Sequence, residues 1–153
     1  MSNWVRLIIC ITIPLAVGGI SGFATSTGIS TWYPQLNKPS FNPPNYLFAP
    51  VWTALYLLMG ISLYIITDKG FINKMVLIFA IQLALNFAWS FVFFYYHQPG
   101  WAFIEILLLW VSILFMIISF YRVNTWASLI QVPYLLWVSF ASVLNFSIWI
   151  LNR

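Results

Sequence analysis

Charged side chains are scarce in this sequence. Its 153 residues include 6 lysines and arginines, 2 aspartates and glutamates and 1 histidine, so that 5% of the chain is charged. About a quarter of an average soluble domain is charged, and so few charges cannot cover a water-facing surface. The cations are also scattered, and no cluster of them is suited to follow a phosphate backbone. This excludes nucleic acid as a partner.

Metal ligands and catalytic groups are equally scarce. The single cysteine, Cys10, excludes an internal disulfide framework and a cysteine-based metal site. One His, one Glu and one Asp are too few for other metal chemistry, so we expect no metal. The sequence has no nucleophile-base pair, no phosphate-binding glycine loop and no paired carboxylates. It therefore lacks the groups that hydrolytic and phosphoryl-transfer enzymes use. We therefore expect that no cofactor is required.

Apolar residues, in contrast, make up 63% of the chain. They form five runs, each near the ~20 residues that a helix needs to cross a bilayer, with short polar breaks between most of them. The predicted fold class is all-α, an integral membrane bundle of five transmembrane helices in a single domain over residues 1–153. The runs cover about 5–26, 45–66, 72–96, 101–121 and 126–151.

One connection is long. Residues 27–44 contain four prolines and three aromatic residues, so they resist both regular helix and disorder. Most other connections in this chain are only a few residues long. This long loop is therefore either a lid over a binding site or a linker that lets the next helix start correctly.

The orientation of the bundle follows from its cations. With five spans, the side that holds the N-terminus carries four of them, and the side of the long loop carries Lys38 and Arg153. This bias predicts a cytoplasmic N-terminus. The four are Arg6, Lys69, Lys74 and Arg122.

The helix over 72–96 has two contrasting faces. Small residues at every fourth position, Ala80, Ala84 and Ala88, form a stripe for close helix packing, either within the chain or in a homodimer. The nearly opposite stripe of this helix carries Gln82, Asn86 and the rings of Trp89 and Phe93. This stripe indicates a polar and aromatic interior.

Aromatic residues are the second abundant class, with 14 Phe, 8 Tyr and 9 Trp. Some tryptophans fit interfacial belts, but four lie deeper in the spans. Trp52 and Tyr56 share one helix face, and Trp137 shares another with small and amide residues. Aromatic walls with a few amides predict either a pocket for a flat apolar ligand or a tightly packed core. The four deep tryptophans are Trp52, Trp89, Trp110 and Trp137.

Glu105 is the only carboxylate inside a predicted span. An intramembrane acid is a functional candidate. The alternative is that it reaches the headgroup region or accepts a hydrogen bond from a neighbouring helix.

Five blocks of residues, in order along nearly the whole chain, resemble the translocator protein / tryptophan-rich sensory protein family, once called the peripheral benzodiazepine receptor. The blocks are Trp32-Tyr33-x-x-Leu36-x-Lys38-Pro39-Ser40-Phe41-x-Pro43-Pro44, Pro50-Val51-Trp52-Thr53-x-Leu55-Tyr56, Gln82-Leu83-Ala84-Leu85-Asn86-x-Ala88-Trp89, Trp101-Ala102 followed by Glu105, and Pro133-Tyr134-Leu135-x-Trp137-x-x-Phe140-Ala141-x-x-Leu144-Asn145.

The resemblance implies a five-helix membrane protein, commonly dimeric, that binds porphyrins such as protoporphyrin IX and isoquinoline carboxamide or benzodiazepine-type ligands beneath the first loop. Tyr56 is added to the implied site because it shares a face with Trp52. Trp32 and Lys38 are implied in the lid. The implied wall residues are Trp52, Asn86, Trp89, Trp101, Trp137, Ala141 and Leu144.

Three functions remain open. The first is porphyrin binding as a receptor in tetrapyrrole handling or stress response. The second is enzymatic, with porphyrin as the substrate of light- or oxidant-dependent breakdown and with Trp52 and Trp137 as the reactive indoles. The third is transport of a porphyrin or sterol. A sterol is disfavoured, because Phe146 stands where the cholesterol pattern of mitochondrial members needs Tyr. We expect a bacterial cell-membrane protein.

Overall fold

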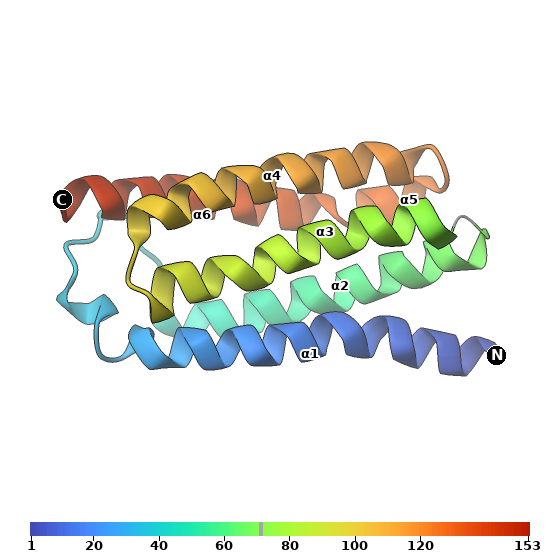
Figure 1. Ribbon diagram of the computed structural model, residues 1–153, viewed down its shortest axis with the longest axis horizontal. Coiled ribbons are helices and arrows are strands. Elements are labelled where there is room, and N and C mark those ends of the chain that lie inside the picture. The colour runs from blue at the N-terminus through green and yellow to red at the C-terminus, as the bar shows by residue number, and fades with distance from the viewer. Residues whose placement is uncertain (71) are drawn as a thin grey trace.

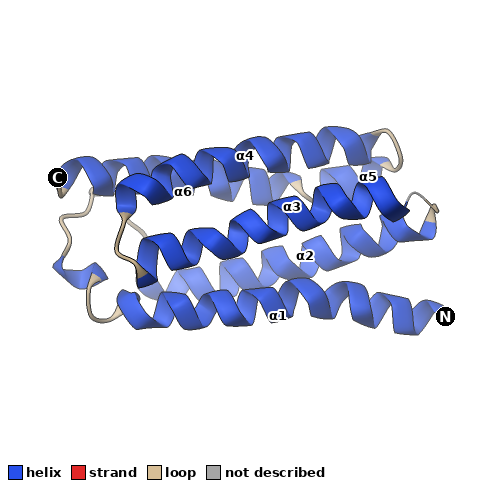
Figure 2. Cartoon of the chain, in the orientation of Figure 1, coloured by secondary structure: helices blue, strands red, loops and turns tan. Residues whose placement is uncertain are grey.

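The computed structural model describes residues 1–70 and 72–153. Five of its helices are long and apolar enough to cross a membrane. This confirms the predicted fold class, and the described residues contain no strand (Figure 2). The helices are α1 (Asn3–Ile29), α2 (Phe48–Asp68), α3 (Ile72–Ser90), α4 (Pro99–Tyr121), α5 (Thr125–Leu129) and α6 (Val132–Leu151), with short helices η1 (Tyr33–Gln35), η2 (Asn45–Leu47) and η3 (Phe91–Tyr95).

The long helices run lengthwise side by side (Figure 1). One end of the bundle holds the loop between α1 and α2, the connection between α3 and α4, and the C-terminus. The opposite end holds the N-terminus and the turn between α4 and α5. The chain therefore alternates between the two ends, as antiparallel neighbours with short connections require.

Local sequence explains where several helices begin. Ser2 caps α1 by accepting a hydrogen bond from the backbone N–H of Val5, and Asn124 caps α5 by accepting one from Ala127 at 3.0 Å. Pro99 opens α4, where its missing N–H costs nothing. Each start coincides with a polar break in the apolar pattern, which is why the number of spans can be read from the sequence.

Two of the predicted spans are not uniform helices. The span expected over 126–151 is interrupted between α5 and α6, because Pro133 has no N–H to continue the helical ladder. Buried Gln131 at this break donates from Nε2 to the carbonyl of Leu58 on α2, at 3.0 Å. The span expected over 72–96 ends in η3, a single stretch of π-helix. Apolar length alone carries no signal for either feature.

Exposed tryptophan and tyrosine side chains gather near the two ends of the bundle. This is the distribution of membrane-interface belts, and it supports placing the long helices across a bilayer. The exposed tryptophans and tyrosines are Trp4, Tyr121 and Trp126 toward the end with the N-terminus, and Tyr46, Tyr95, Tyr96 and Trp101 toward the end with the long loop.

Close approach of α1 and α2 depends on glycine. A Cβ added at Gly60 would lie 2.6 Å from the Cα of Ile11 and 2.9 Å from the carbonyl oxygen of Cys10. Both atoms belong to the backbone, so the helices would have to move apart. A Cβ at Gly22 would have nothing within 4 Å.

We therefore expect Gly60→Ala to destabilise the protein by about 1–3 kcal/mol through overpacking. Gly22→Ala is the matched control on α1, and it should leave stability unchanged or raise it slightly because alanine favours helix. Reversible unfolding in mixed micelles measures both. Equal stability of the two variants would contradict the assigned helix contact.

Candidate functional site

A cavity of about 610 Å³ lies in the half of the bundle nearest the long loop. Its volume falls within the ~300–1,000 Å³ typical of small-molecule sites. Side chains from α1, α2, α3, η3 and α6 line it, and Tyr33 of the long loop contributes from above. The cavity thus depends on helices from both ends of the sequence.

Aromatic rings form much of the cavity wall. Trp52 on α2 and Trp137 on α6 meet edge to face, with ring centroids 6.5 Å apart. On another part of the wall, Trp89 stacks on Phe93 at 5.2 Å. Two consecutive residues of the π-helix η3, Phe93 and Phe94, also line the cavity.

A chain of hydrogen bonds lies beneath the aromatic wall. The hydroxyl of Tyr56 donates to Oδ1 of Asn86 at 2.6 Å, and Nδ2 of Asn86 donates to the hydroxyl of Tyr134 at 3.0 Å. Tyr134 in turn donates to Oε1 of Gln82 at 2.8 Å. All four side chains are buried. The chain joins α2, α3 and α6 and fixes the ring of Tyr56 in the cavity wall.

Asn145 performs a similar task at the loop end of α6. Its Oδ1 accepts a hydrogen bond from Nε1 of Trp89 at 3.0 Å, and its Nδ2 donates to the carbonyl of Pro99 at 2.8 Å. The side chain is 1% exposed. One amide therefore orients an indole of the cavity wall and ties α6 to the start of α4.

The loop above the cavity is folded and anchored. Its Asn37 and the C-terminal Asn152 exchange hydrogen bonds of 2.9 and 2.8 Å through their backbone and side-chain groups. The ring of Trp32 stacks on His97 of the α3–α4 connection, with centroids 4.4 Å apart. His97 has a φ of 56°, a left-handed conformation that the turn requires. The loop is thus fastened to two neighbouring segments.

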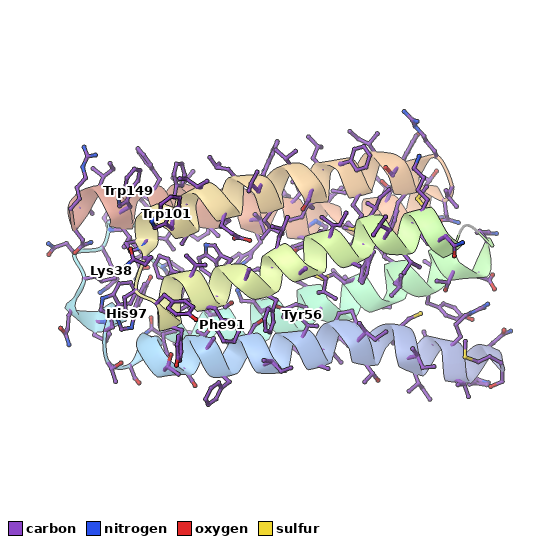
Figure 3. The ribbon with its side chains drawn as sticks, viewed as in Figure 1. Lys38, Tyr56, Phe91, His97, Trp101 and Trp149 are labelled. Carbon is purple, nitrogen blue, oxygen red and sulfur yellow. The ribbon has the colours of Figure 1, made fainter. Side chains whose placement is uncertain are left out.

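Two further contacts act within the loop. Tyr33 donates its hydroxyl to Oδ1 of Asn42 at 2.6 Å, and burial raises the pKa of Tyr33 to about 12, so it stays neutral at physiological pH. The ammonium of Lys38 donates to the carbonyls of Tyr33 and Leu36 at 2.8 and 2.9 Å. Lys38 lies with His97 at the loop end, whereas Tyr56 lies deeper in the bundle (Figure 3).

The mouth of the cavity lies between α1 and the segment formed by η2 and the start of α2. Every lining residue that is exposed belongs to one of these two segments. A Cβ at either Gly19 or Gly22 would have nothing within 4 Å, which shows that space is open beside α1. The opening therefore faces sideways from the bundle. The exposed lining residues are Gly19, Gly22, Ser26, Asn45, Tyr46, Ala49 and Thr53.

Comparison with known proteins shows the family of this chain. Residues 10–150 match the model of the TspO/MBR family. The chain belongs to the TspO/MBR family. It is 46% identical over 150 residues to the tryptophan-rich protein TspO of Chlorobaculum tepidum, covering 95% of each chain. It is 42% identical to the protein of that name from Archaeoglobus fulgidus, over 98% of this chain and 99% of the relative. The human translocator protein is 37% identical over 77% of this chain and 73% of its own.

The structure gathers six of the residues that the family resemblance and the helix faces predicted for the site. They line one cavity and come from three different helices. These residues are Trp52, Tyr56, Trp89, Trp137, Ala141 and Leu144.

Four other predicted site residues lie outside the lining of the cavity. Asn86 is beneath it, in the hydrogen-bond chain that positions Tyr56. Trp32 and Lys38 belong to the loop above, where they hold the loop's own fold. Trp101 lies on the outer surface and is 68% exposed.

The sequence interpretation missed the contribution of α1. Ser21, Thr25 and Gly18 line the cavity, although the sequence shows only small residues there. Small and hydroxyl side chains repeating along one helix face were a usable signal. Such side chains are equally typical of a helix that packs closely against another helix. Only the positions of the neighbouring helices decide whether this face packs against a helix or lines a cavity.

Two further predicted features are placed by the structure. Ala80 and Ala84 are exposed and Ala88 is half-buried, so this stripe faces away from the core. Both carboxyl oxygens of Glu105 are buried and have no hydrogen-bond partner among the described residues, yet Glu105 is not part of the cavity lining.

We expect Tyr134→Phe to destabilise this TspO/MBR protein by about 1–3 kcal/mol, because it leaves Gln82 and Asn86 with buried polar atoms that lack partners. Tyr121→Phe, at an exposed tyrosine of α4, is the matched control and should change stability by less than ~0.5 kcal/mol. Unfolding free energies in micelles measure both. A neutral Tyr134→Phe would contradict the assigned hydrogen-bond chain.

Proposed function

We propose that this TspO/MBR membrane protein binds porphyrins such as protoporphyrin IX, and ligands of the isoquinoline carboxamide or benzodiazepine type, in the aromatic cavity, and acts in tetrapyrrole handling or stress response. The cavity itself carries this proposal. It has the volume of a small-molecule site and walls of indole and phenyl rings. Each well-placed aromatic pair adds about 0.5–1.5 kcal/mol beyond burial, which favours a flat ring system.

The protein's setting is part of the proposal. We place it in a bacterial cell membrane with the N-terminus in the cytoplasm, because four of the six cations lie on that side. The exposed stripe of Ala80 and Ala84 is the face on which a second copy would pack in a homodimer.

Protoporphyrin IX should quench tryptophan fluorescence saturably in protein reconstituted in nanodiscs. A Trp52→Leu/Trp137→Leu variant should bind it more weakly by about 1–3 kcal/mol, because two stacking partners are lost. A Trp4→Leu/Trp126→Leu variant also loses two indoles, but these are 76% and 71% exposed at the opposite end of the bundle, so its affinity should be unchanged. Quenching that does not saturate, or that weakens equally in both variants, would count against the cavity as the porphyrin site.

A second candidate function is light- or oxidant-dependent degradation of the bound porphyrin. The observation that favours it is the pairing of Trp52 and Trp137, two oxidisable indoles that meet edge to face in the cavity wall, with ring centroids 6.5 Å apart. A porphyrin held there would lie against both rings. Indoles in this position could pass electrons to an excited porphyrin or trap the oxidising species that it forms with dioxygen.

Illumination in air tests the enzymatic role. Trp52→Phe/Trp137→Phe keeps aromatic walls but removes both indoles, so binding should persist while porphyrin loss, followed by absorbance, slows at least tenfold. Degradation at the wild-type rate in this variant, with porphyrin still bound, would rule out the indole mechanism and leave binding as the function.

A further inference from the structure

The cavity wall formed by α1 and α3 carries four hydroxyl side chains, of which those of Ser21 and Ser90 are buried. Ser21 is 3% exposed and lines the cavity, and Ser90, 8% exposed, lines it from α3. The Oγ of Ser21 approaches the phenol of Tyr56 but forms no hydrogen bond among the described residues. A buried hydroxyl without a partner is unfavourable. An atom of a bound ligand would supply the missing partner.

The Ser21 hydroxyl is also kept available by its neighbours. Thr25, which could have bonded to it, instead donates its own hydroxyl to the backbone carbonyl of Ser21, at 3.1 Å. Tyr56 donates its own hydrogen to Asn86, so its oxygen can act toward Ser21 only as an acceptor. Because Ser21 forms no hydrogen bond among the described residues, it can turn its hydrogen from Tyr56 to a ligand at little cost.

No charged side chain of the described residues lines the cavity. The nearest candidate from the sequence, Lys38, holds its ammonium against the carbonyls of Tyr33 and Leu36 and over the ring of Tyr33 at 5.0 Å. Pairing Lys38 with a ligand would break these contacts. A carboxylate inside the cavity would thus be buried without a counter-ion, which is costly.

The position of the mouth points to the same ligand chemistry. The opening lies between two membrane-crossing helices. It is bordered by glycine, alanine, serine and threonine, with Asn45 and Tyr46 at its interface end. A molecule that enters by this route comes from the bilayer. Ionised groups are rare in its hydrocarbon region because of their desolvation cost, so the route favours uncharged molecules.

We propose that the cavity selects an uncharged flat ring molecule whose carbonyl oxygen accepts a hydrogen bond from Ser21, and that it excludes ionised carboxylates. The inference rests on the proposed function, since it specifies the charge state and polar group of the ligand in that same cavity. A porphyrin therefore binds best with its carboxyl groups neutralised, and Lys38 serves the loop rather than the ligand.

Protoporphyrin IX and its uncharged dimethyl ester test the charge selection. Both are titrated onto the full chain in nanodiscs, with tryptophan quenching as the readout. The ester should bind at least as tightly as the free acid, and Lys38→Gln should change the two affinities by the same factor. Weaker binding of the ester, or a Lys38→Gln loss confined to the free acid, would overturn the proposal by showing a carboxylate-lysine pair.

An uncharged isoquinoline carboxamide tests the role of Ser21, because its amide carbonyl is the proposed acceptor. Ser21→Ala removes a hydroxyl that has no partner in the protein, so the variant should fold, and it should bind this ligand roughly three- to tenfold more weakly. Ser112→Ala is the matched control. Its hydroxyl bonds to the carbonyl of Leu109 within α4, outside the cavity lining, so affinity should not change. Equal affinity of Ser21→Ala and wild type would overturn the assigned hydrogen bond.

The two ligand types separate failure of this inference from failure of the proposed function. If neither porphyrin binds, the proposal that the protein binds porphyrins is wrong. The affinity of Ser21→Ala for the carboxamide then decides whether Ser21 donates to a ligand. If both porphyrins bind and the free acid binds more tightly, porphyrin binding stands and the charge selection is wrong.

Discussion

The absence of water in the bilayer core governs this structure more than any other constraint. A polar group among the helices must find its partner within the protein, and the chain has few such groups to place. Tyr56, Asn86, Tyr134 and Gln82 meet most of this requirement together, since each hydrogen bond in the series engages two side chains and joins two helices, although Nε2 of Gln82 has no partner among the described residues. The network both holds three helices in register and aims an aromatic ring at the cavity.

The same constraint explains why the cavity is selective. Most polar atoms near it are already engaged, as with the amide of Asn145, which accepts from Trp89 and donates to Pro99. What remains for a ligand is therefore a large aromatic surface together with the buried hydroxyls of Ser21 and Ser90. A site of this kind discriminates by shape and by charge more than by many specific hydrogen bonds.

Glycine has a second, geometric role in this bundle. At Gly60 it lets the backbones of α1 and α2 approach closely, and at Gly28 it lets α1 lie against the carbonyl of Phe94. Between these two contacts, at Gly19 and Gly22, the space beside α1 is open. Because α1 is held near both ends and open in between, the cavity has a stable mouth.

The sequence by itself determined the five spans, the membrane setting and the deep position of Trp52, Trp89 and Trp137. Apolar run length and helical periodicity are local properties, and each can be read from one segment at a time. Tertiary structure alone decided that Trp101 faces outward, that Lys38 bonds to its own loop and that Ser21 lines the cavity. These outcomes depend on which neighbour each side chain meets, and that neighbour comes from a distant part of the chain.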